Sequence, residues 1–181
     1  APFDSLEAFN RKFVDENSIR LYMVSNPKKI TVKNLSITTV EVSNHPVKEM
    51  GKRKIDVDGN FYISGEDAQS IKEGEQIRLL GLGNILITKQ GEEIEGEYVK
   101  DGDIKSIPKI QWVSQKTAHK IKMIIPKILF IGEDFNEDSL EERDVYCEPH
   151  YLQLKDGEEI QFIRFGYCRK DSQNQAIFTH K

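Results

Sequence analysis

The stretch Glu158-Glu159-Ile160-Gln161-Phe162-Ile163-Arg164-Phe165-Gly166-Tyr167, followed by Ala176-Ile177-Phe178-Thr179-His180-Lys181, is the most informative part of the chain. It has the residue pattern of β-strands with a polar face. Gln161 and Arg164 lie three residues apart with aromatic residues beside them. Arginine offers a rigid fork of donors and glutamine offers a donor and an acceptor, so together they can read the edge of an unpaired base. The simpler alternative is an amphipathic strand in an all-β protein.

The same kind of short strand recurs along most of the chain. Fourteen segments are rich in β-branched or aromatic residues and are predicted to be strands: 19–24, 28–35, 38–42, 53–57, 61–64, 75–80, 84–89, 95–99, 110–113, 120–125, 128–130, 151–154, 159–169 and 176–180. Turn dipeptides such as Asp58-Gly59 and Asp156-Gly157 separate them at hairpin-like spacing. Many short strands without βαβ alternation indicate an all-β fold, and this number favours two small β-barrels over one.

Helix is predicted in only two places. Leu6, Phe9 and Phe13 recur at helical spacing behind the N-cap candidate Asp4, so residues 1–18 are expected to form a short helical linker. Residues 66–72 are expected to form another helical turn, and the acidic residues 132–144 a loop. The two barrels are expected within residues 19–181, with their boundary open.

The C-terminal segment is expected to return to the first barrel. Such a return would bring Arg20, at the start of the first strand, close to Gln161 and Arg164.

Charge is distributed unevenly along the chain. The net charge is −4, but residues 11–54 hold ten Lys/Arg against four Asp/Glu, residues 91–160 hold nine against seventeen, and residues 161–181 hold four against one. Basic ends around an acidic middle suit a phosphate-facing surface if the two ends meet. The alternative is that these charges coat solvated faces. No apolar run approaches the ~20 residues of a membrane span, and Cys147 and Cys168 match no metal or redox spacing. A reduced, cytoplasmic protein with no membrane association is therefore expected.

Motifs of independent catalysis are lacking in the sequence. The four histidines have no metal-ligand spacing, and no nucleophile elbow, phosphate-binding loop or kinase signature occurs. We therefore expect neither catalytic residues nor a metal site. Residues suited to binding are better represented: Arg20 has Tyr22 on the same strand face, and Arg78 alternates with apolar neighbours. Arg20 could equally be a salt-bridge partner, and Arg78 could equally be part of a solvated strand face.

Five motifs in order resemble the anticodon-binding region of archaeal and eukaryotic-type glutamyl-tRNA synthetases, which belong to the Glu/Gln subfamily of class I aminoacyl-tRNA synthetases. They cover nearly the whole chain: Arg20-Leu21-Tyr22-Met23-Val24-Ser25-Asn26-Pro27, His45-Pro46-Val47-Lys48-Glu49-Met50-Gly51-Lys52-Arg53, Glu73-Gly74-Glu75-Gln76-Ile77-Arg78-Leu79, Ile110-Gln111-Trp112-Val113-Ser114 and Gln161-Phe162-Ile163-Arg164-Phe165-Gly166-Tyr167. The resemblance implies a pair of small β-barrels like those of ribosomal protein L25.

The resemblance also implies a set of RNA-binding residues. The family's anticodon contacts fall on Arg20, Arg78, Gln161 and Arg164, with Lys72 as the candidate for the third base. Tyr22, Phe165 and Tyr167 are candidates for stacking on splayed bases. The sequence departs from the family pattern at Leu80, where some relatives have arginine, and at Ile163, where an acidic residue is usual.

By the same resemblance the chain is part of an enzyme that attaches glutamate to tRNA(Glu) with ATP. The ending Phe178-Thr179-His180-Lys181 is similar to the archaeal glutamyl branch. No ATP-handling motif occurs, so ATP and Mg²⁺ are expected only in a catalytic domain outside this chain, and the chain alone is expected to be inactive and monomeric. Four alternatives stay open: charging of tRNA(Gln) as well, a glutaminyl-tRNA synthetase region, a free-standing L25-like rRNA-binding protein, and a protein-docking module.

Overall fold

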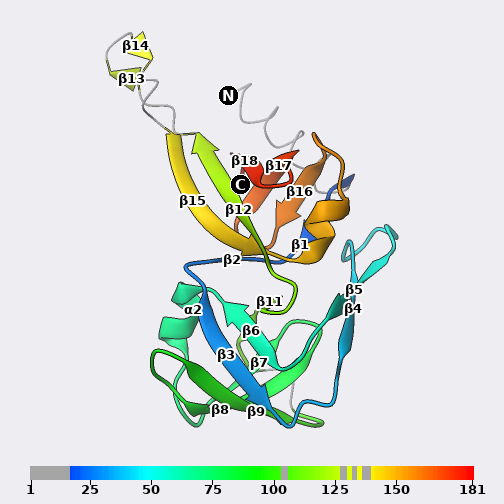
Figure 1. Ribbon diagram of the computed structural model, residues 1–181, viewed down its shortest axis with the longest axis vertical. Helices are drawn as coiled ribbons and strands as arrows, with labels where there is room; N and C mark the ends of the chain where they lie inside the picture. Colours follow the sequence, from blue (N-terminus) through cyan, green and yellow to red (C-terminus); the bar gives the residue numbers. More distant parts are fainter. Residues whose placement is uncertain (1–16, 103–105, 127–129, 132–133, 136–139) are drawn as a thin grey trace.

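The fold is all-β, as predicted, and consists of two seven-stranded sheets (Figure 1). The computed structural model describes residues 17–102, 106–126, 130–131, 134–135 and 140–181. The central barrel comprises, in spatial order, β10 (Lys109–Ile110), β7 (Gln76–Leu79), β8 (Gly83–Lys89), β9 (Ile94–Val99), β3 (Lys28–Lys33), β6 (Asn60–Ile63) and β11 (Val113–Ser114). The terminal barrel comprises β1 (Ile19–Leu21), β16 (Glu159–Phe162), β17 (Gly166–Ser172), β18 (Gln175–His180), β12 (His119–Pro126), β15 (Leu140–Cys147) and β2 (Met23–Ser25).

Strands from both ends of the described chain build the terminal barrel. β1 pairs in parallel with β16, so that Arg20 lies directly opposite Gln161, and β2 pairs with β15. The chain leaves this barrel after residue 25, forms the whole central barrel, and returns at β12. In Figure 1 the terminal barrel accordingly combines blue strands with yellow, orange and red ones.

In each sheet the two edge strands are consecutive pieces of one chain segment. The edge strands of the terminal sheet, β1 and β2, are separated only by Tyr22, and those of the central sheet, β10 and β11, only by Gln111 and Trp112. Two consecutive pieces of one bent segment therefore pair with opposite edges of the same sheet.

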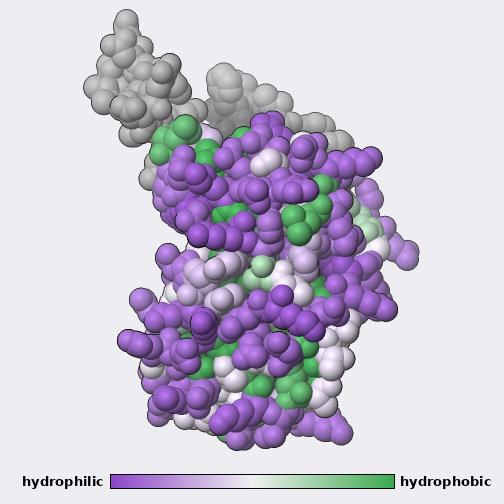
Figure 2. Space-filling view, in the orientation of Figure 1, coloured by the Kyte–Doolittle hydropathy of each residue, from purple (hydrophilic) through white to green (hydrophobic). Residues whose placement is uncertain are grey.

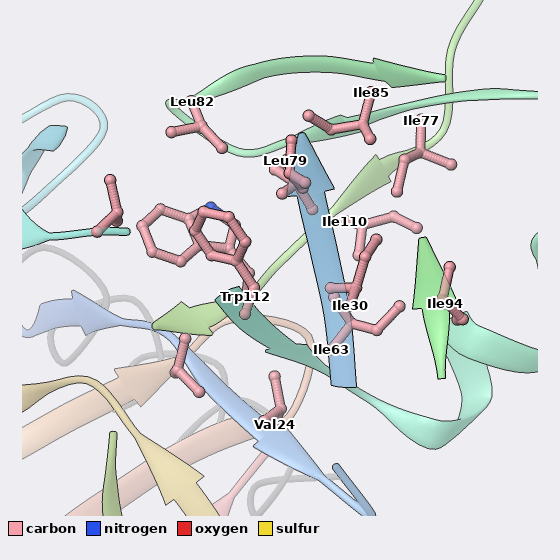
Figure 3. Close-up of a cluster of buried hydrophobic side chains, with 14 of the residues drawn as sticks. Val24, Ile30, Ile63, Ile77, Leu79, Leu82, Ile85, Ile94, Ile110 and Trp112 are labelled. Atoms are coloured by element: carbon pink, nitrogen blue, oxygen red, sulfur yellow. The ribbon is translucent and has the colours of Figure 1, made fainter. Parts of the chain in front are cut away.

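The two barrels have separate cores that share one strand segment. In residues 19–24, Ile19, Leu21 and Met23 point into the terminal core, whereas Tyr22 and Val24 point into the central core. This alternation follows from the period of two in a β-strand. The central core surrounds Trp112, which is fully buried, and Figure 3 shows Val24 reaching this cluster from the neighbouring strand. Because one strand lines both cores, the barrels are held against one another, and the space-filling view shows them in contact (Figure 2).

Side chains from both barrels complete their junction. The rings of Tyr62 and Tyr146 stack with centroids 4.8 Å apart. Gln111 donates from Nε2 to the Ile163 carbonyl oxygen at 3.0 Å, and its Oε1 accepts from the Met23 N–H at 3.2 Å. Gln111 is only 6% exposed, so its whole amide serves the junction.

Smaller elements surround the two sheets. They are a hairpin of β4 (Thr39–Ser43) and β5 (Lys52–Asp56), helix α2 (Gly65–Ser70), the 3₁₀ helix η1 (Pro149–Gln153), and the short pair β13 (Phe130–Ile131) and β14 (Asp134–Phe135). The β4–β5 hairpin extends from the central barrel toward the terminal one (Figure 1). Helix α2 confirms the helical turn expected at residues 66–72. Among the described residues, no helix has the length and apolar character to cross a membrane.

Three predictions of local structure are wrong. Residues 151–154 lie mostly in η1 rather than in a strand, and the predicted strand 159–169 is interrupted by a turn at residues 163–165. The loop expected at 132–144 ends earlier, because β15 begins at Leu140. The acidic residues of β15 made the segment resemble a loop in the sequence. In the structure, Asp144 and Glu142 form ion pairs with Lys120 and Lys122 of the neighbouring strand β12, at 3.7 and 3.5 Å. The predicted helix in residues 1–16 lies outside the described residues.

Candidate nucleic-acid interface

Four side chains form a row across the terminal barrel. Arg20 of β1 is paired in register with Gln161 of β16, Gln161 with Tyr167 of β17, and Tyr167 with His180 of β18. Directly paired residues share one face of a sheet. Their neighbours Leu21, Ile160 and Phe162 belong to the barrel core, so the row lies on the outer face. The rings of Tyr167 and His180 stack with centroids 4.7 Å apart and an interplanar angle of 18°.

Arg164 lies in the turn that follows β16, next to this row. Arg164 has a positive φ of 62°, which is uncommon for a residue with a side chain. The turn is fixed by hydrogen bonds from the Phe165 N–H to the Phe162 carbonyl oxygen at 3.0 Å and from the Ile163 N–H to the Leu21 carbonyl oxygen at 3.3 Å. The Phe165 ring meets Phe178 edge-on with centroids 5.5 Å apart. Arg164 is thereby held at the surface, where its side chain is 51% exposed.

Two cavities adjoin this turn. The smaller, of about 270 Å³, is lined by Gln161, Arg164, Phe165, Gly166, Tyr167 and Lys181. The larger, of about 540 Å³, lies between the barrels, with walls from β2 and β18 of one barrel and from Ser64 and Glu66 of the other. Arg164, Phe165 and Lys181 line both cavities. The smaller cavity thus combines amide, guanidinium, ammonium and aromatic groups without an acidic side chain, which suits the edge, face and phosphate of a nucleotide.

An unsatisfied acceptor lies at this site. Gln161 Oε1 is buried, and no donor among the described residues reaches it. Buried polar atoms in folded proteins are nearly always hydrogen-bonded, and an exception calls for an explanation such as a missing ligand or water. A donor on a bound base could supply this partner.

The backbone of Arg20 is held by the β4–β5 hairpin. Its N–H donates to the Asn44 carbonyl oxygen at 2.8 Å. Asn44 is itself held by Arg53, whose Nη1 donates to Asn44 Oδ1 at 3.2 Å. Arg53 also forms a buried ion pair with Glu148, and Glu148 Oε2 accepts from the Tyr22 N–H at 2.7 Å. The groups on either side of Arg20 are therefore fixed by one buried polar network.

The same hairpin shows why a basic sequence run need not be a basic patch. Lys52 and Arg53 are consecutive, yet Arg53 points inward and only 2% of its side chain is exposed, whereas Lys52 stays in solvent. His45 has a structural role in the hairpin loop, because its Nδ1 accepts from the N–H groups of Val47 and Lys48 at 3.1 and 2.9 Å.

Tyr22 lies where it cannot stack on a base in this structure. It shares a strand face with Arg20, as expected, but the central barrel covers that face from residue 22 onward, and Tyr22 is 4% exposed. Its ring packs on Trp112 at 5.6 Å, and its hydroxyl donates to the Leu80 carbonyl oxygen at 3.4 Å. Burial raises the pKa of Tyr22 to about 12. Tyr167 is also buried, at 5%, beneath its stack with His180, which leaves Phe165 as the half-exposed aromatic ring of the three.

Arg78 and Lys72 lie on the central barrel, apart from the row. Arg78 is on β7 and donates from Nη1 to Asn84 Oδ1 at 3.0 Å. Lys72 is exposed in the segment after α2, where its N–H donates to Glu75 Oε2 at 3.3 Å. The structure therefore brings Arg20, Gln161, Arg164, Phe165 and Tyr167 to one region of the terminal barrel, and keeps Arg78 and Lys72 on the other barrel.

Sequence reasoning overlooked Asp67, Gln111 and His180 at this site. Asp67 of α2 forms an ion pair with Arg164, Gln111 joins the barrels, and His180 extends the row. Asp67 and Arg164 are 97 positions apart in the chain, so no local pattern links them. His180 alone carried a signal, because it closes the alternating segment that pairs with β17.

Comparison with protein families matches two adjacent models across most of the chain. Both are described as "tRNA synthetases class I (E and Q), anti-codon binding domain"; one matches residues 18–106 and the other residues 109–171. The chain belongs to this family. The division between the two models falls just before β10, so the first covers most of the central barrel and the second most of the returning strands of the terminal barrel.

Three relatives of this anticodon-binding domain are glutamate–tRNA ligases. The chain is 71% identical over its full length to the glutamate–tRNA ligase of Nitrosopumilus maritimus (strain SCM1), and 48% identical over 99% of its length to that of Cenarchaeum symbiosum (strain A). It is 27% identical over 98% of its length to that of Methanocaldococcus jannaschii. The chain spans about a third of the length of these relatives: 32%, 32% and 30%.

Proposed function

We propose that this chain recognises the anticodon of tRNA(Glu) as part of a glutamate–tRNA ligase. The observation that carries the proposal is the cavity lined by Gln161 and Arg164, beside the cross-strand row that begins with Arg20. The family assignment and the names of the relatives support it. The relatives' shared name favours tRNA(Glu) over tRNA(Gln) as the first RNA to test.

In this proposal an unpaired anticodon base enters the smaller cavity. Arg20, Gln161 and Arg164 hydrogen-bond its Watson–Crick edge, and the half-exposed ring of Phe165 stacks on its face. Tyr167 lines the same cavity, and its ring is held by the stack with His180. Lys181, which lines the same cavity, holds a phosphate. Tyr22 contributes by packing rather than by base contact.

Arg78 and Lys72 are proposed to contact other parts of the anticodon loop. Both lie on the central barrel, and a loop that is spread out by its protein partner can reach two adjoining domains. Arg78 keeps donors beyond the one that it shares with Asn84, because a guanidinium carries five N–H groups. Lys72, as a flexible point charge, suits phosphate better than a specific base edge.

The complete ligase is proposed to join glutamate to tRNA(Glu) in the cytoplasm, with this chain as a monomeric recognition part. ATP and Mg²⁺ would act in a region beyond the present sequence. Among the described residues, no three His, Cys, Asp or Glu side chains gather in a way that could hold a metal ion. The chain by itself is expected not to aminoacylate.

Binding of RNA hairpins tests the proposal directly. We would measure the Kd of the chain for the anticodon stem-loop of tRNA(Glu), for versions with each anticodon base replaced, and for the stem-loop of tRNA(Gln), at two salt concentrations. The matched stem-loop should bind more tightly than the replaced ones, and both should weaken as salt rises. Equal binding of matched and replaced loops would refute anticodon recognition and favour an rRNA-type or non-specific RNA-binding role.

Arg164→Ala should weaken binding of the matched stem-loop by about 1–3 kcal/mol, the range for a bidentate base contact in DNA complexes. Arg169→Ala is the matched control, because Arg169 is exposed on β17 of the same barrel and lines neither cavity. It removes the same charge without removing a proposed base contact. Equal losses for the two variants would show that Arg164 acts only through its charge.

A further inference from the structure

The Arg164 side chain forms an ion pair with Asp67 of the central barrel. Arg164 Nη2 donates to Asp67 Oδ2 at 2.5 Å, and Nη1 donates to Oδ1 at 3.3 Å. The contact joins the β16–β17 turn of the terminal barrel to helix α2 of the central one. The side chain of Asp67 is 15% exposed and that of Arg164 is 51% exposed.

Both partners are attached to rigid backbone. Asp67 lies in the first turn of α2, where its N–H donates to the N-cap oxygen Ser64 Oγ at 3.2 Å. The turn that carries Arg164 is fixed from two sides, by the Ile163 N–H bond to Leu21 and by the bond from Gln111 to the Ile163 carbonyl oxygen. The direction of the guanidinium is therefore set by how the two barrels sit together.

The ion pair orients Arg164 without using up its donors. A guanidinium has five N–H groups in a fixed plane, and Asp67 accepts one from each terminal nitrogen. The Nε–H and one N–H on each terminal nitrogen remain for a ligand. An exposed arginine otherwise samples many rotamers, and holding it in one of them lowers the entropy lost on binding.

We propose that Asp67 is the positioning residue for Arg164, and that its ion pair across the barrel junction sets how strictly the smaller cavity selects its base. This inference rests on the proposed function, because it concerns the same RNA-binding site. It assigns a role in recognition to α2, which contributes to neither the cross-strand row nor the smaller cavity.

The proposal and simple electrostatics predict opposite changes in RNA affinity when Asp67 is removed. RNA is a polyanion, so removal of a carboxylate near its binding site should raise affinity. If Asp67 positions Arg164, its removal should instead lower the affinity for the matched stem-loop. Glu66 is the matched control, because it is the neighbouring carboxylate, lines the larger cavity and is not part of the Arg164 ion pair.

The experiment compares the wild-type chain with Asp67→Ala, Asp67→Asn, Glu66→Ala, Arg164→Ala and the double variant Asp67→Ala/Arg164→Ala. The Kd values for the matched stem-loop and for a loop with one anticodon base replaced would be measured at one low salt concentration, with thermal unfolding of each variant. Asp67→Asn keeps the shape of the side chain and one acceptor oxygen, so it supplies a second variant if Asp67→Ala folds poorly.

Asp67→Ala should lower both the matched affinity and the ratio of matched to mismatched affinity by about fivefold, as expected for coupled neighbours. Asp67→Asn should have a smaller effect, and Glu66→Ala should leave the ratio unchanged. In the Arg164→Ala background, removal of Asp67 should cause no further loss. The proposal would be overturned if Asp67→Ala raised the affinity for the matched stem-loop as much as Glu66→Ala does. It would also be overturned if removal of Asp67 lowered the affinity or the ratio in the Arg164→Ala background.

Failure of the proposed function gives a different result. In that case the wild-type chain itself would not distinguish the matched loop from the replaced one, and both proposals would fall. If the wild type discriminates and the Asp67 variants discriminate equally well, anticodon recognition stands and only the role of Asp67 is refuted.

Discussion

Removing one partner of the buried ion pair between Arg53 and Glu148 should cost more stability than removing one partner of any exposed pair in the described structure. The exposed fractions of the two side chains are 2% and 0%. Arg53→Met would leave the Glu148 carboxylate buried, and within the described part of the chain only the Tyr22 N–H would still donate to it. Breaking a buried pair by removing one partner costs about 3–5 kcal/mol. For a chain of this size, with an m-value of about 2 kcal/mol/M in urea, the unfolding midpoint should fall by about 2 M.

The chain offers a convenient probe for this measurement. Its single tryptophan, Trp112, is fully buried at the centre of the central core, so tryptophan fluorescence in a urea titration reports unfolding of that barrel. The matched set is Arg53→Met, Glu148→Gln and the double variant. Glu148→Gln keeps an acceptor for the Tyr22 N–H while removing the charge.

The double variant separates the ion pair from its surroundings. It leaves no uncompensated charge, so its loss should be smaller than the sum of the two single losses by about 2–3 kcal/mol. The losses should change little between low and high salt, because buried pairs are poorly screened. Single losses below about 1 kcal/mol, or losses that simply add, would refute the reasoning, since such values are typical of exposed pairs.

Two further predictions concern other buried polar groups. Lys170→Met should lower the free energy of unfolding by about 2–4 kcal/mol in the same urea titration. Lys170 Nζ donates to the carbonyl oxygens of Tyr151 and Leu154 at 3.1 and 2.7 Å, and a buried acceptor without a donor costs about 1–3 kcal/mol. A loss under about 0.5 kcal/mol, the level of ordinary surface changes, would contradict this prediction. Stability should also decline above about pH 10, because the unfolded chain loses the Tyr22 proton near its ordinary pKa of 10.0 while the folded chain keeps it to about pH 12. Between these two pKa values, Tyr22 should lower the free energy of unfolding by about 1.4 kcal/mol per pH unit. Tyr22→Phe should remove this contribution to the slope, and an unchanged slope in the variant would exclude Tyr22 as its cause.

Local patterns in the sequence predicted much of the fold for simple physical reasons. The content of β-branched and aromatic residues in segments such as 28–35 and 84–89 identified strands, because such side chains pack well on a half-buried pleated surface. A helical turn was predicted at residues 66–72, and in the structure Ser64 caps helix α2 and Asp67 lies in its first turn. The order of five motifs along the chain indicated the family, and the comparisons confirmed it.

Long-range partners explain where local patterns failed. Residues 151–154 have the composition of a strand, but Pro149 opens the 3₁₀ helix η1, and the buried ammonium of Lys170 binds the carbonyl oxygens at its end. The acidic run before Val145 has the composition of a loop, but lysines of β12 neutralise it as a strand. In both cases the deciding charge comes from a strand more than fifteen residues away in the chain.

At the candidate site, the sequence by itself determined which residue types are present and which of them share a strand face. Arg20 and Tyr22 share a face because strand side chains alternate. Only the tertiary structure decided what covers that face: the central barrel buries Tyr22, while Arg20 lies opposite Gln161 in the outer row. It also brought Asp67 to Arg164 across 97 positions. Alternation is a property of the backbone and can be read locally, whereas burial and pairing depend on segments that meet only after both barrels have formed.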